Sequence, residues 1–209
     1  MLFESKKLRD SDFVSLDIET TGLSPKNSQV LEIGLLHFSK DRILGDYRTY
    51  IKPQKFQNGA VTVNGITEDL LENAPTLEDV ASELFPILRG KPLVIQNAEF
   101  DLSFLLNDVR TVGLFEDSSP VYCTLQLSRK YFPGLPSYSL DSLRKKFYIS
   151  EFQKSRGGIA HEALDDCFAA MKVFIECANQ GNLWESDSGL AAYHQKNLKI
   201  IYDYKRKLI

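Results

Sequence analysis

Residues 12–19 read DFVSLDIE, and apolar side chains recur there at every second position. In an extended chain, Val14, Leu16 and Ile18 then lie on one side. This alternation predicts a strand with one apolar face. Asp17 and Glu19 leave the strand on the opposite face, with their Cα atoms about 6.5 Å apart.

The paired carboxylates of Asp17 and Glu19 have two interpretations. Neighbouring carboxylates repel each other and raise each other's pKa unless a cation lies between them. Hard divalent cations such as Mg²⁺ prefer oxygen ligands of this kind. The alternative is an acidic, solvent-exposed strand edge, and the pair alone does not decide between the two.

Farther along the chain, apolar spacing predicts more strands and helices. Strands are expected at residues 30–38, 43–51 and 93–95, with a hairpin turn at 39–42. Helices are expected at residues 76–88, 98–110, 124–131, 140–147, 161–179 and 189–207. Thr76 and Asp79 have the spacing of a helix-capping pair. Three strands followed by alternating helix and strand indicate an α/β domain with a mixed sheet.

Asp101 follows the short apolar strand expected at 93–95. One interpretation is an acid in the first turn of a helix, which stabilises the helix by about 0.3–1 kcal/mol. The other is a site residue, because ligands in open α/β sheets gather beyond the carboxyl ends of the strands. If this strand lies parallel and adjacent to the strand at 12–19, Asp101 meets Asp17 and Glu19.

Two neighbouring acids, Asp165 and Asp166, fall in the helix expected at 161–179. At 100° per residue, Asp165 shares a stripe with Lys172 and Glu176, so we expect it to face water. The stripe of Asp166 is apolar and consists of Ala169, Ala170, Val173 and Cys177. Because an acid on an apolar stripe is costly unless it is paired or bound to a metal, Asp166 is the functional candidate.

His161 lies five residues before Asp166, about 140° away around a helix. We therefore expect it in the preceding loop or the first turn, leaning over the acids. The alternative is an ordinary exposed histidine in a glycine-rich loop. Basic residues before His161 could grip phosphates or could form a solvated loop: Arg144, Lys145, Lys146, Lys154 and Arg156.

The composition is that of an ordinary soluble globular protein, with 209 residues, 43% of them hydrophobic. We expect one domain over residues 1–180 and a C-terminal helical extension over residues 181–209. The chain has no apolar run long enough for a bilayer and no secretory signal, so we expect a cytoplasmic protein without a membrane partner. Its three cysteines form no metal or redox pair and are expected to be buried and reduced.

The net charge of −3 speaks against a protein that coats nucleic acid with a basic surface. A nucleic-acid substrate must therefore be held locally. Bound metal ions would add positive charge that the residue count omits.

Four short segments, in chain order, are residues 17–23 (DIETTGL), 63–67 (VNGIT), 97–101 (NAEFD) and 161–166 (HEALDD). Together they resemble the DnaQ-like exonucleases of the DEDDh type, which include the proofreading epsilon subunit of bacterial DNA polymerase III. The resemblance runs from Ser11 to Asn179. It implies a ribonuclease-H-like fold, with a central mixed five-stranded sheet flanked by helices. It also implies a 3′–5′ exonuclease that uses two divalent cations, Mg²⁺ or Mn²⁺.

The resemblance implies a role for each candidate residue. Asp17 would bridge both cations, and Asp101 would help to hold the cation that lies away from the nucleophile. Glu19 and Asp166 would hold the cation on the side of the nucleophile, and His161 would deprotonate the attacking water. Contacts with the terminal nucleotide are implied for Thr20, Gly22, Leu23, Asn64, Asn97 and Phe100.

The reaction that we expect releases nucleoside 5′-monophosphates from the 3′ end of single-stranded nucleic acid, DNA rather than RNA, in proofreading or repair. One alternative is an RNA-trimming or oligoribonuclease-type enzyme. Another is a catalytically silent nucleic-acid-binding or scaffold module, which the presence of all four acids disfavours. The helix expected at 189–207 could dock a DNA polymerase or could pack on its own domain.

Overall fold

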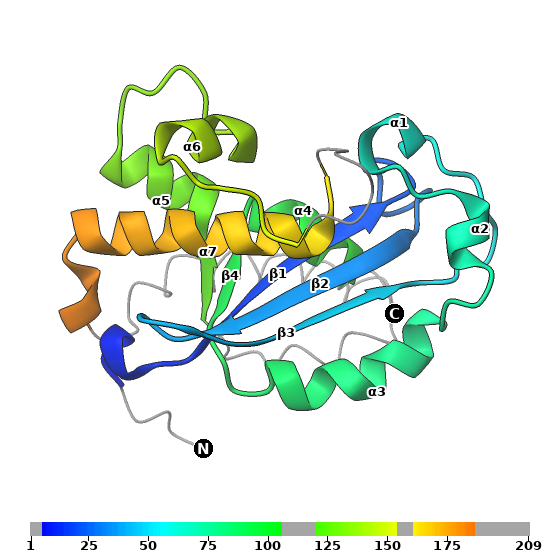
Figure 1. The fold of residues 1–209 in the computed structure, drawn as a ribbon, viewed down its shortest axis with the longest axis horizontal. Coiled ribbons are helices and arrows are strands. Elements are labelled where there is room, and N and C mark those ends of the chain that lie inside the picture. Colours follow the sequence, from blue (N-terminus) through cyan, green and yellow to red (C-terminus); the bar gives the residue numbers. More distant parts are fainter. Residues whose placement is uncertain (1–5, 106–119, 154–160, 187–209) are drawn as a thin grey trace, which may run out of the picture.

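A single mixed sheet forms the centre of the protein (Figure 1). The computed structural model describes residues 6–105, 120–153 and 161–186. The sheet has the order β3-β2-β1-β4-β5 and consists of β1 (Phe13–Thr20), β2 (Val30–Phe38), β3 (Ile43–Tyr50), β4 (Leu93–Ile95) and β5 (Val121–Cys123). The first three strands are antiparallel, whereas β4 runs parallel to β1 and to β5. The predicted five-stranded mixed sheet is confirmed.

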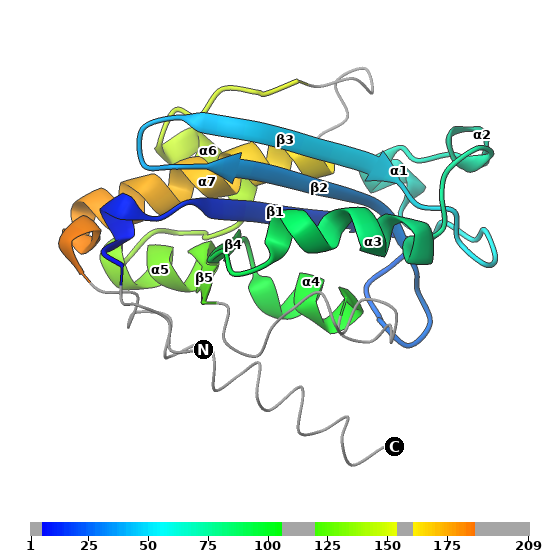
Figure 2. The ribbon, with the colours of Figure 1, turned by 90° about the horizontal axis from the view of Figure 1, so that it is seen from below.

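The alternation in β1 separates two apolar layers on the two faces of the sheet. Val14, Leu16 and Ile18 belong to the core that includes apolar residues of α3 (Leu77–Leu88) and α4 (Ala98–Leu105). Phe13 points to the other face, where α7 (Ala163–Gln180) packs across the strands. The layers are visible in Figure 2, where α3 and α4 lie on the side of the sheet away from α7.

The layer beneath α7 is rich in aromatic side chains. Phe13 stacks on Phe38 with 5.3 Å between ring centroids, and Phe174 of α7 lies 5.0 Å from Phe13. Tyr122 and Trp184 complete the cluster through edge or tilted contacts with Phe174. Burial of these large rings holds the helix firmly against the strands.

Gly34 in β2 allows α7 to begin very close to the sheet. A Cβ atom at this position would lie 2.6 Å from the backbone carbonyl carbon of Ala163, the first residue of the helix. One turn later, the Cys167 thiol donates a hydrogen bond to the Gly34 carbonyl at 3.1 Å. This close approach brings the start of α7 beside the acidic face of β1.

Several predicted helices are confirmed, with small changes at their ends. They include α3, α5 (Thr124–Tyr131), α6 (Leu140–Lys146) and α7. Thr76 and Asp79 form the expected reciprocal cap, with each backbone N–H bonded to the other side chain. The sequence did not predict α1 (Val61–Asn64), α2 (Glu68–Leu71), β5 or the 3₁₀ turns η1 (Leu8–Asp10) and η3 (Leu183–Glu185).

Some expectations fall outside the described residues. They concern the end of the helix at 98–110, most of the loop before His161, and the helix at 189–207. The three cysteines are buried and unpaired, as expected. Within the described ranges, no helix is long and apolar enough to cross a membrane.

Candidate active site

Asp17 and Glu19 point from β1 toward the beginning of α7. They lie on the face opposite Val14, Leu16 and Ile18, as the alternation requires. Glu19 is only 8% exposed, and Asp17 is partly buried. The interpretation of these acids as a solvent-exposed strand edge is therefore wrong.

Asp101 reaches the same place from the neighbouring strand. Because β4 is parallel and adjacent to β1, the helix that follows β4 begins near the end of β1. Asp101 lies in the first turn of this helix, α4, and is 2% exposed. Its Oδ1 accepts a hydrogen bond from the Ile18 backbone N–H at 3.1 Å. The peptide between Asp17 and Glu19 is thus bound directly to the third acid.

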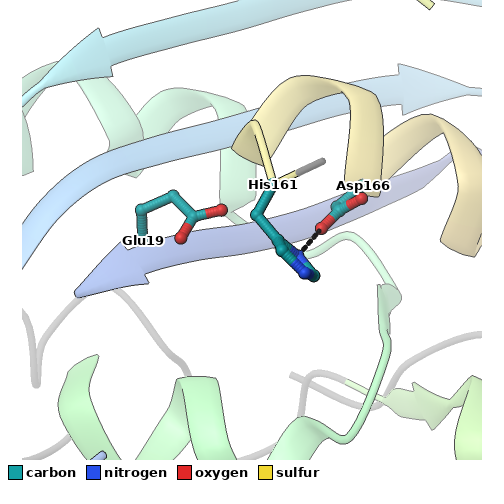
Figure 3. Close-up of side chains that lie close together, drawn as sticks. All are labelled: Glu19, His161 and Asp166. Carbon is teal, nitrogen blue, oxygen red and sulfur yellow. Dashed lines mark hydrogen bonds and ion pairs between the residues drawn. The ribbon is translucent and has the colours of Figure 1, made fainter. Parts of the chain in front are cut away.

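Asp166 and His161 come from the start of α7 (Figure 3). Asp166 is in the first turn of the helix, and His161 lies just before it, as expected. The His161 Nδ1 atom is 3.1 Å from Asp166 Oδ2. Ligand atoms of Glu19, His161 and Asp166 all lie within 4.8 Å of one another.

The carboxylates of the site repel one another electrostatically. Burial raises the pKa of Asp17 well above its usual value, and the charges of Asp101, Asp166 and Glu19 raise it further. Burial also raises the pKa of Asp101, although hydrogen bonds from backbone N–H groups oppose this shift. The hydrogen bond to Asp166 raises the pKa of His161, while burial lowers it by less. A nearby cation would relieve the repulsion among these carboxylates.

The donor set fits a hard divalent cation. Carboxylate oxygens are the preferred ligands of Mg²⁺ and also suit Mn²⁺. Within the described part of the chain, the Asp17 carboxylate makes no hydrogen bond or ion pair. A partly buried acid with like-charged neighbours and no partner has the environment that metal binding would stabilise.

Asp165 does not face water, so this expectation is wrong. Its side chain is 1% exposed and accepts hydrogen bonds from the Phe152 N–H at 2.6 Å and from Arg144 at 2.7 Å. Lys172, farther along the same stripe, is exposed, but α6 and the residues after it cover the stripe at Asp165. Arg144 is engaged with α7 as well, whereas Lys154 and Arg156 lie outside the described residues.

A second buried group of charges, which the sequence did not predict, joins β2 and β3 to the start of α7. Arg48 of β3 binds Glu32 at 2.6 Å and Glu162 at 3.2 Å. Glu32 also accepts the Ala163 N–H at 3.3 Å, at the start of α7. A glutamate inside the apolar run of β2 was the available signal, but its partner depends on strand register, which the local pattern does not give.

Three residues expected to touch substrate lie after or at the end of β1. Thr20 is buried, and its hydroxyl donates to the Gly22 carbonyl at 2.7 Å. Leu23 is 86% exposed, which is unusual for a large apolar residue and leaves its side chain available for contact. A hydrogen bond from Thr20 therefore holds the start of the turn, and Leu23 exposes an apolar side chain within it.

The other three expected contact residues differ in their accessibility. Asn64 is 1% exposed, and its amide donates to the Thr20 carbonyl and accepts from the Ile66 N–H. It therefore supports the turn after β1 from within the protein. Asn97 is exposed and has a left-handed backbone, with φ of 54°. Phe100 is partly buried and lies 5.1 Å from Phe104, centroid to centroid.

Known proteins share this sequence pattern. The profile of the RNase_T family, described as exonuclease, matches residues 14–174. The PolC-type DNA polymerase III of Caldanaerobacter subterraneus subsp. tengcongensis is 33% identical over 83% of the chain, which spans only 12% of that protein. The epsilon subunit of DNA polymerase III from Buchnera aphidicola subsp. Schizaphis graminum is 30% identical, with 78% of this chain and 72% of that one covered.

A solved structure of exonuclease X with 5′-overhanging duplex DNA shares the fold. Its TM-score is 0.67 at 23% sequence identity, with 86% of this chain and 98% of that chain covered. This likeness supports the ribonuclease-H-like architecture that the sequence motifs implied.

Proposed function

We propose a specific reaction for this chain. The chain belongs to the RNase_T exonuclease family, and this membership makes it an enzyme of the expected 3′–5′ exonuclease class. In this reaction, the chain hydrolyses the terminal phosphodiester at the 3′ end of single-stranded DNA and releases nucleoside 5′-monophosphates. Asp17, Glu19, Asp101 and Asp166 hold two divalent cations, Mg²⁺ or Mn²⁺.

The observation that carries this proposal is the meeting of acids from three separate elements. The bond from Ile18 N–H to Asp101 joins β1 to α4, and the grouping of Glu19 with Asp166 joins β1 to α7. Acids of like charge are costly to bury together without a cation. Their convergence therefore favours a metal-dependent hydrolase over a silent binding module.

The substrate presents two chemical difficulties that such a site can address. A phosphodiester repels an attacking hydroxide, and its leaving alkoxide is poor. When bound, a pair of cations activates water and stabilises the leaving oxygen. The four acids orient that pair, and the exposed Leu23 beside them offers an apolar surface to the terminal nucleotide.

His161 is suited to accept the proton of the attacking water. If Nδ1 carries the proton that is shared with Asp166, the lone pair lies on Nε2, which then acts as the base. The side chain is 38% exposed, so water and substrate can approach it. Asp166 and Glu19 raise the pKa of His161 in the absence of cations, and cations held by the same acids would offset that rise, which would leave a neutral imidazole near neutral pH.

DNA is the proposed substrate because one relative is named a PolC-type DNA polymerase III and the other a subunit of DNA polymerase III. The chain corresponds to only a small part of the PolC-type protein, so its link to a polymerase is also a proposal. A role in proofreading or repair, with a polymerase docked on the helix expected at 189–207, extends the same reasoning.

The direct test is digestion of a single-stranded DNA oligonucleotide labelled at its 5′ end. We expect a ladder that shortens from the 3′ end with Mg²⁺ or Mn²⁺, and no digestion with EDTA. Chromatography should identify nucleoside 5′-monophosphates as products. Internal fragments, or digestion that EDTA leaves unchanged, would contradict the proposal.

A matched RNA oligonucleotide tests the substrate class separately. Faster digestion of DNA is expected, whereas faster digestion of RNA would favour the RNA-trimming alternative. A duplex with a 3′ mismatch, compared with a fully paired duplex, tests proofreading. A proofreading enzyme should remove the unpaired terminal nucleotide faster.

A further inference from the structure

Arg144 is the feature of the site that the proposed reaction does not use. It projects from α6 to the start of α7, and its side chain is 13% exposed. Its Nη2 atom lies 3.1 Å from Asp166 Oδ1, 2.7 Å from Asp165 Oδ2 and 2.6 Å from the Asp165 carbonyl oxygen. One guanidinium therefore joins both acids of the helix.

The two oxygens of Asp166 have different partners. Oδ1 accepts a hydrogen bond from Arg144, whereas Oδ2 lies beside His161, in the group that these two residues form with Glu19. A carboxylate held by one oxygen cannot rotate without breaking that bond. The other oxygen is thereby fixed in the direction of the proposed cations.

Asp165 fixes Arg144 in turn. Its Oδ2 binds the guanidinium, and its Oδ1 accepts the Phe152 N–H at 2.6 Å. The Phe152 ring stacks on Phe168 of α7, with 4.7 Å between centroids and 7° between planes. Asp165 is 1% exposed, so both hydrogen bonds are shielded from water.

From these contacts, we infer that Arg144 and Asp165 are positioning residues, which hold the Asp166 carboxylate in the orientation needed for cation binding and catalysis. The inference rests on the proposed function. Arg144 does not contact the DNA strand in this account. It acts through Asp166, as outer hydrogen-bond partners of metal ligands commonly do.

The test compares the wild-type 209-residue chain with Arg144→Met, Arg144→Lys and the control Arg129→Met, which removes an exposed arginine at the end of α5. For each protein, kcat and KM are measured by digestion of 5′-labelled single-stranded DNA in Mn²⁺. The assay temperature is well below the unfolding temperature of every variant. We expect Arg144→Met to lower kcat about 10-fold to 100-fold, with KM and the salt dependence unchanged. Arg144→Lys should recover part of the loss, and Arg129→Met should match the wild type.

Calorimetry of Mn²⁺ binding without DNA provides a readout other than activity. Loss of Arg144 removes a positive charge, which favours cation binding, but also releases Asp166. Positioning predicts that the second effect prevails and that Mn²⁺ affinity falls by about 10-fold. Tighter Mn²⁺ binding would show that Arg144 merely competes with the cation, and would overturn the inference.

A rise in KM with a weaker salt dependence would show that Arg144 contacts phosphates, and unchanged kcat would show that it has no part in the reaction. Either result overturns the inference. If Arg144→Met does not fold, Asp165→Asn replaces it, because the amide oxygen can still accept the Phe152 N–H. A moderate loss of kcat is then expected, and none would contradict positioning. Failure of the wild type itself to digest any oligonucleotide would instead reject the proposed function.

Discussion

Two groups of buried charges flank the beginning of α7, and they differ in how their charge is balanced. Behind the helix start, Arg48 lies between Glu32 and Glu162 and binds both. In front of it, the acids of β1, α4 and α7 converge, and burial and mutual repulsion raise the pKa values of Asp17 and Asp101. Arg48 balances the charge of the first group. In the second group, Arg144 and His161 contact Asp166, and within the described ranges Asp17 has no cationic partner.

This difference indicates that the first group stabilises the fold and that the second takes part in the reaction. The Arg48 group fastens β2 and β3 to the helix start, where Glu32 also accepts the Ala163 N–H. The group around Asp17 costs stability in the absence of a bound cation. Glu32 and Glu162 share an arginine, which indicates a structural role. Asp17 has like-charged neighbours and, among the described residues, no hydrogen bond or ion pair, which indicates a place for a metal ion.

The largest expected effect is on activity when Asp17 loses its charge. Asp17→Asn should lower the rate of Mg²⁺-dependent DNA digestion by about 10³-fold or more, because proper cation binding contributes several kcal/mol to the transition state. Asp46→Asn, at an exposed position of β3, is the matched control and should retain full activity. Substantial activity in Asp17→Asn would remove the distinction between the two groups.

Removal of Arg48 should reduce stability strongly. Arg48→Met leaves two buried glutamates without their cation, and we expect the free energy of unfolding to fall by about 3–5 kcal/mol. Urea denaturation measures this change, with Arg42→Met in the exposed hairpin turn as control. A loss no greater than that of the control would show that the Arg48 group does not support the fold.

His161 should affect turnover more than cation binding. His161→Gln is expected to lower kcat by about 10²-fold, the usual contribution of a general base. Mn²⁺ affinity, measured by calorimetry, should stay close to that of the wild type and of the control His37→Gln. Since His161 lies within ligand distance of Glu19 and Asp166, a collapse of Mn²⁺ affinity would make it a ligand instead.

The smallest effect concerns the pH dependence of stability without metal. Asp17 and Asp101 have raised pKa values in the folded protein, so the folded state binds more protons than the unfolded chain. Their contribution is fully present below about pH 4 and is lost as pH rises through the raised pKa values. In EDTA, we expect this contribution to the free energy of unfolding to fall between pH 4 and pH 7.

Thermal or urea unfolding across this pH range measures the decline. Asp17→Asn should reduce it, and Mg²⁺ should offset it by binding the folded state. The free energy of unfolding of the wild type in EDTA could instead rise over this pH range by as much as that of Asp17→Asn. That result would show that the acids do not repel one another as described.

Much of this arrangement could be predicted from local sequence, because alternation and helical spacing report which face a residue occupies. The strand of Asp17, the place of His161 before α7 and the apolar stripe of Asp166 follow from such patterns. The meeting of Asp101 with β1 was predicted only on the condition that β4 is parallel and adjacent.

What could not be predicted depends on contacts between distant segments. The stripe of Asp165 contains Lys172 and Glu176, and nothing local shows that α6 and Phe152 cover its beginning. The pairing of Arg48 with Glu32 and Glu162 requires strand register and the position of α7. Short elements such as β5 and α1 carry too little periodicity to be recognised.

The central claim is that the group around Asp17, and not the group around Arg48, binds divalent cations. A crystal grown with Mn²⁺, measured at a wavelength where manganese scatters anomalously, tests this directly. We predict anomalous density among the carboxylates of Asp17, Glu19, Asp101 and Asp166, and none beside Glu32 and Glu162. Carboxylates that remain in place with no ion density between them would contradict the account.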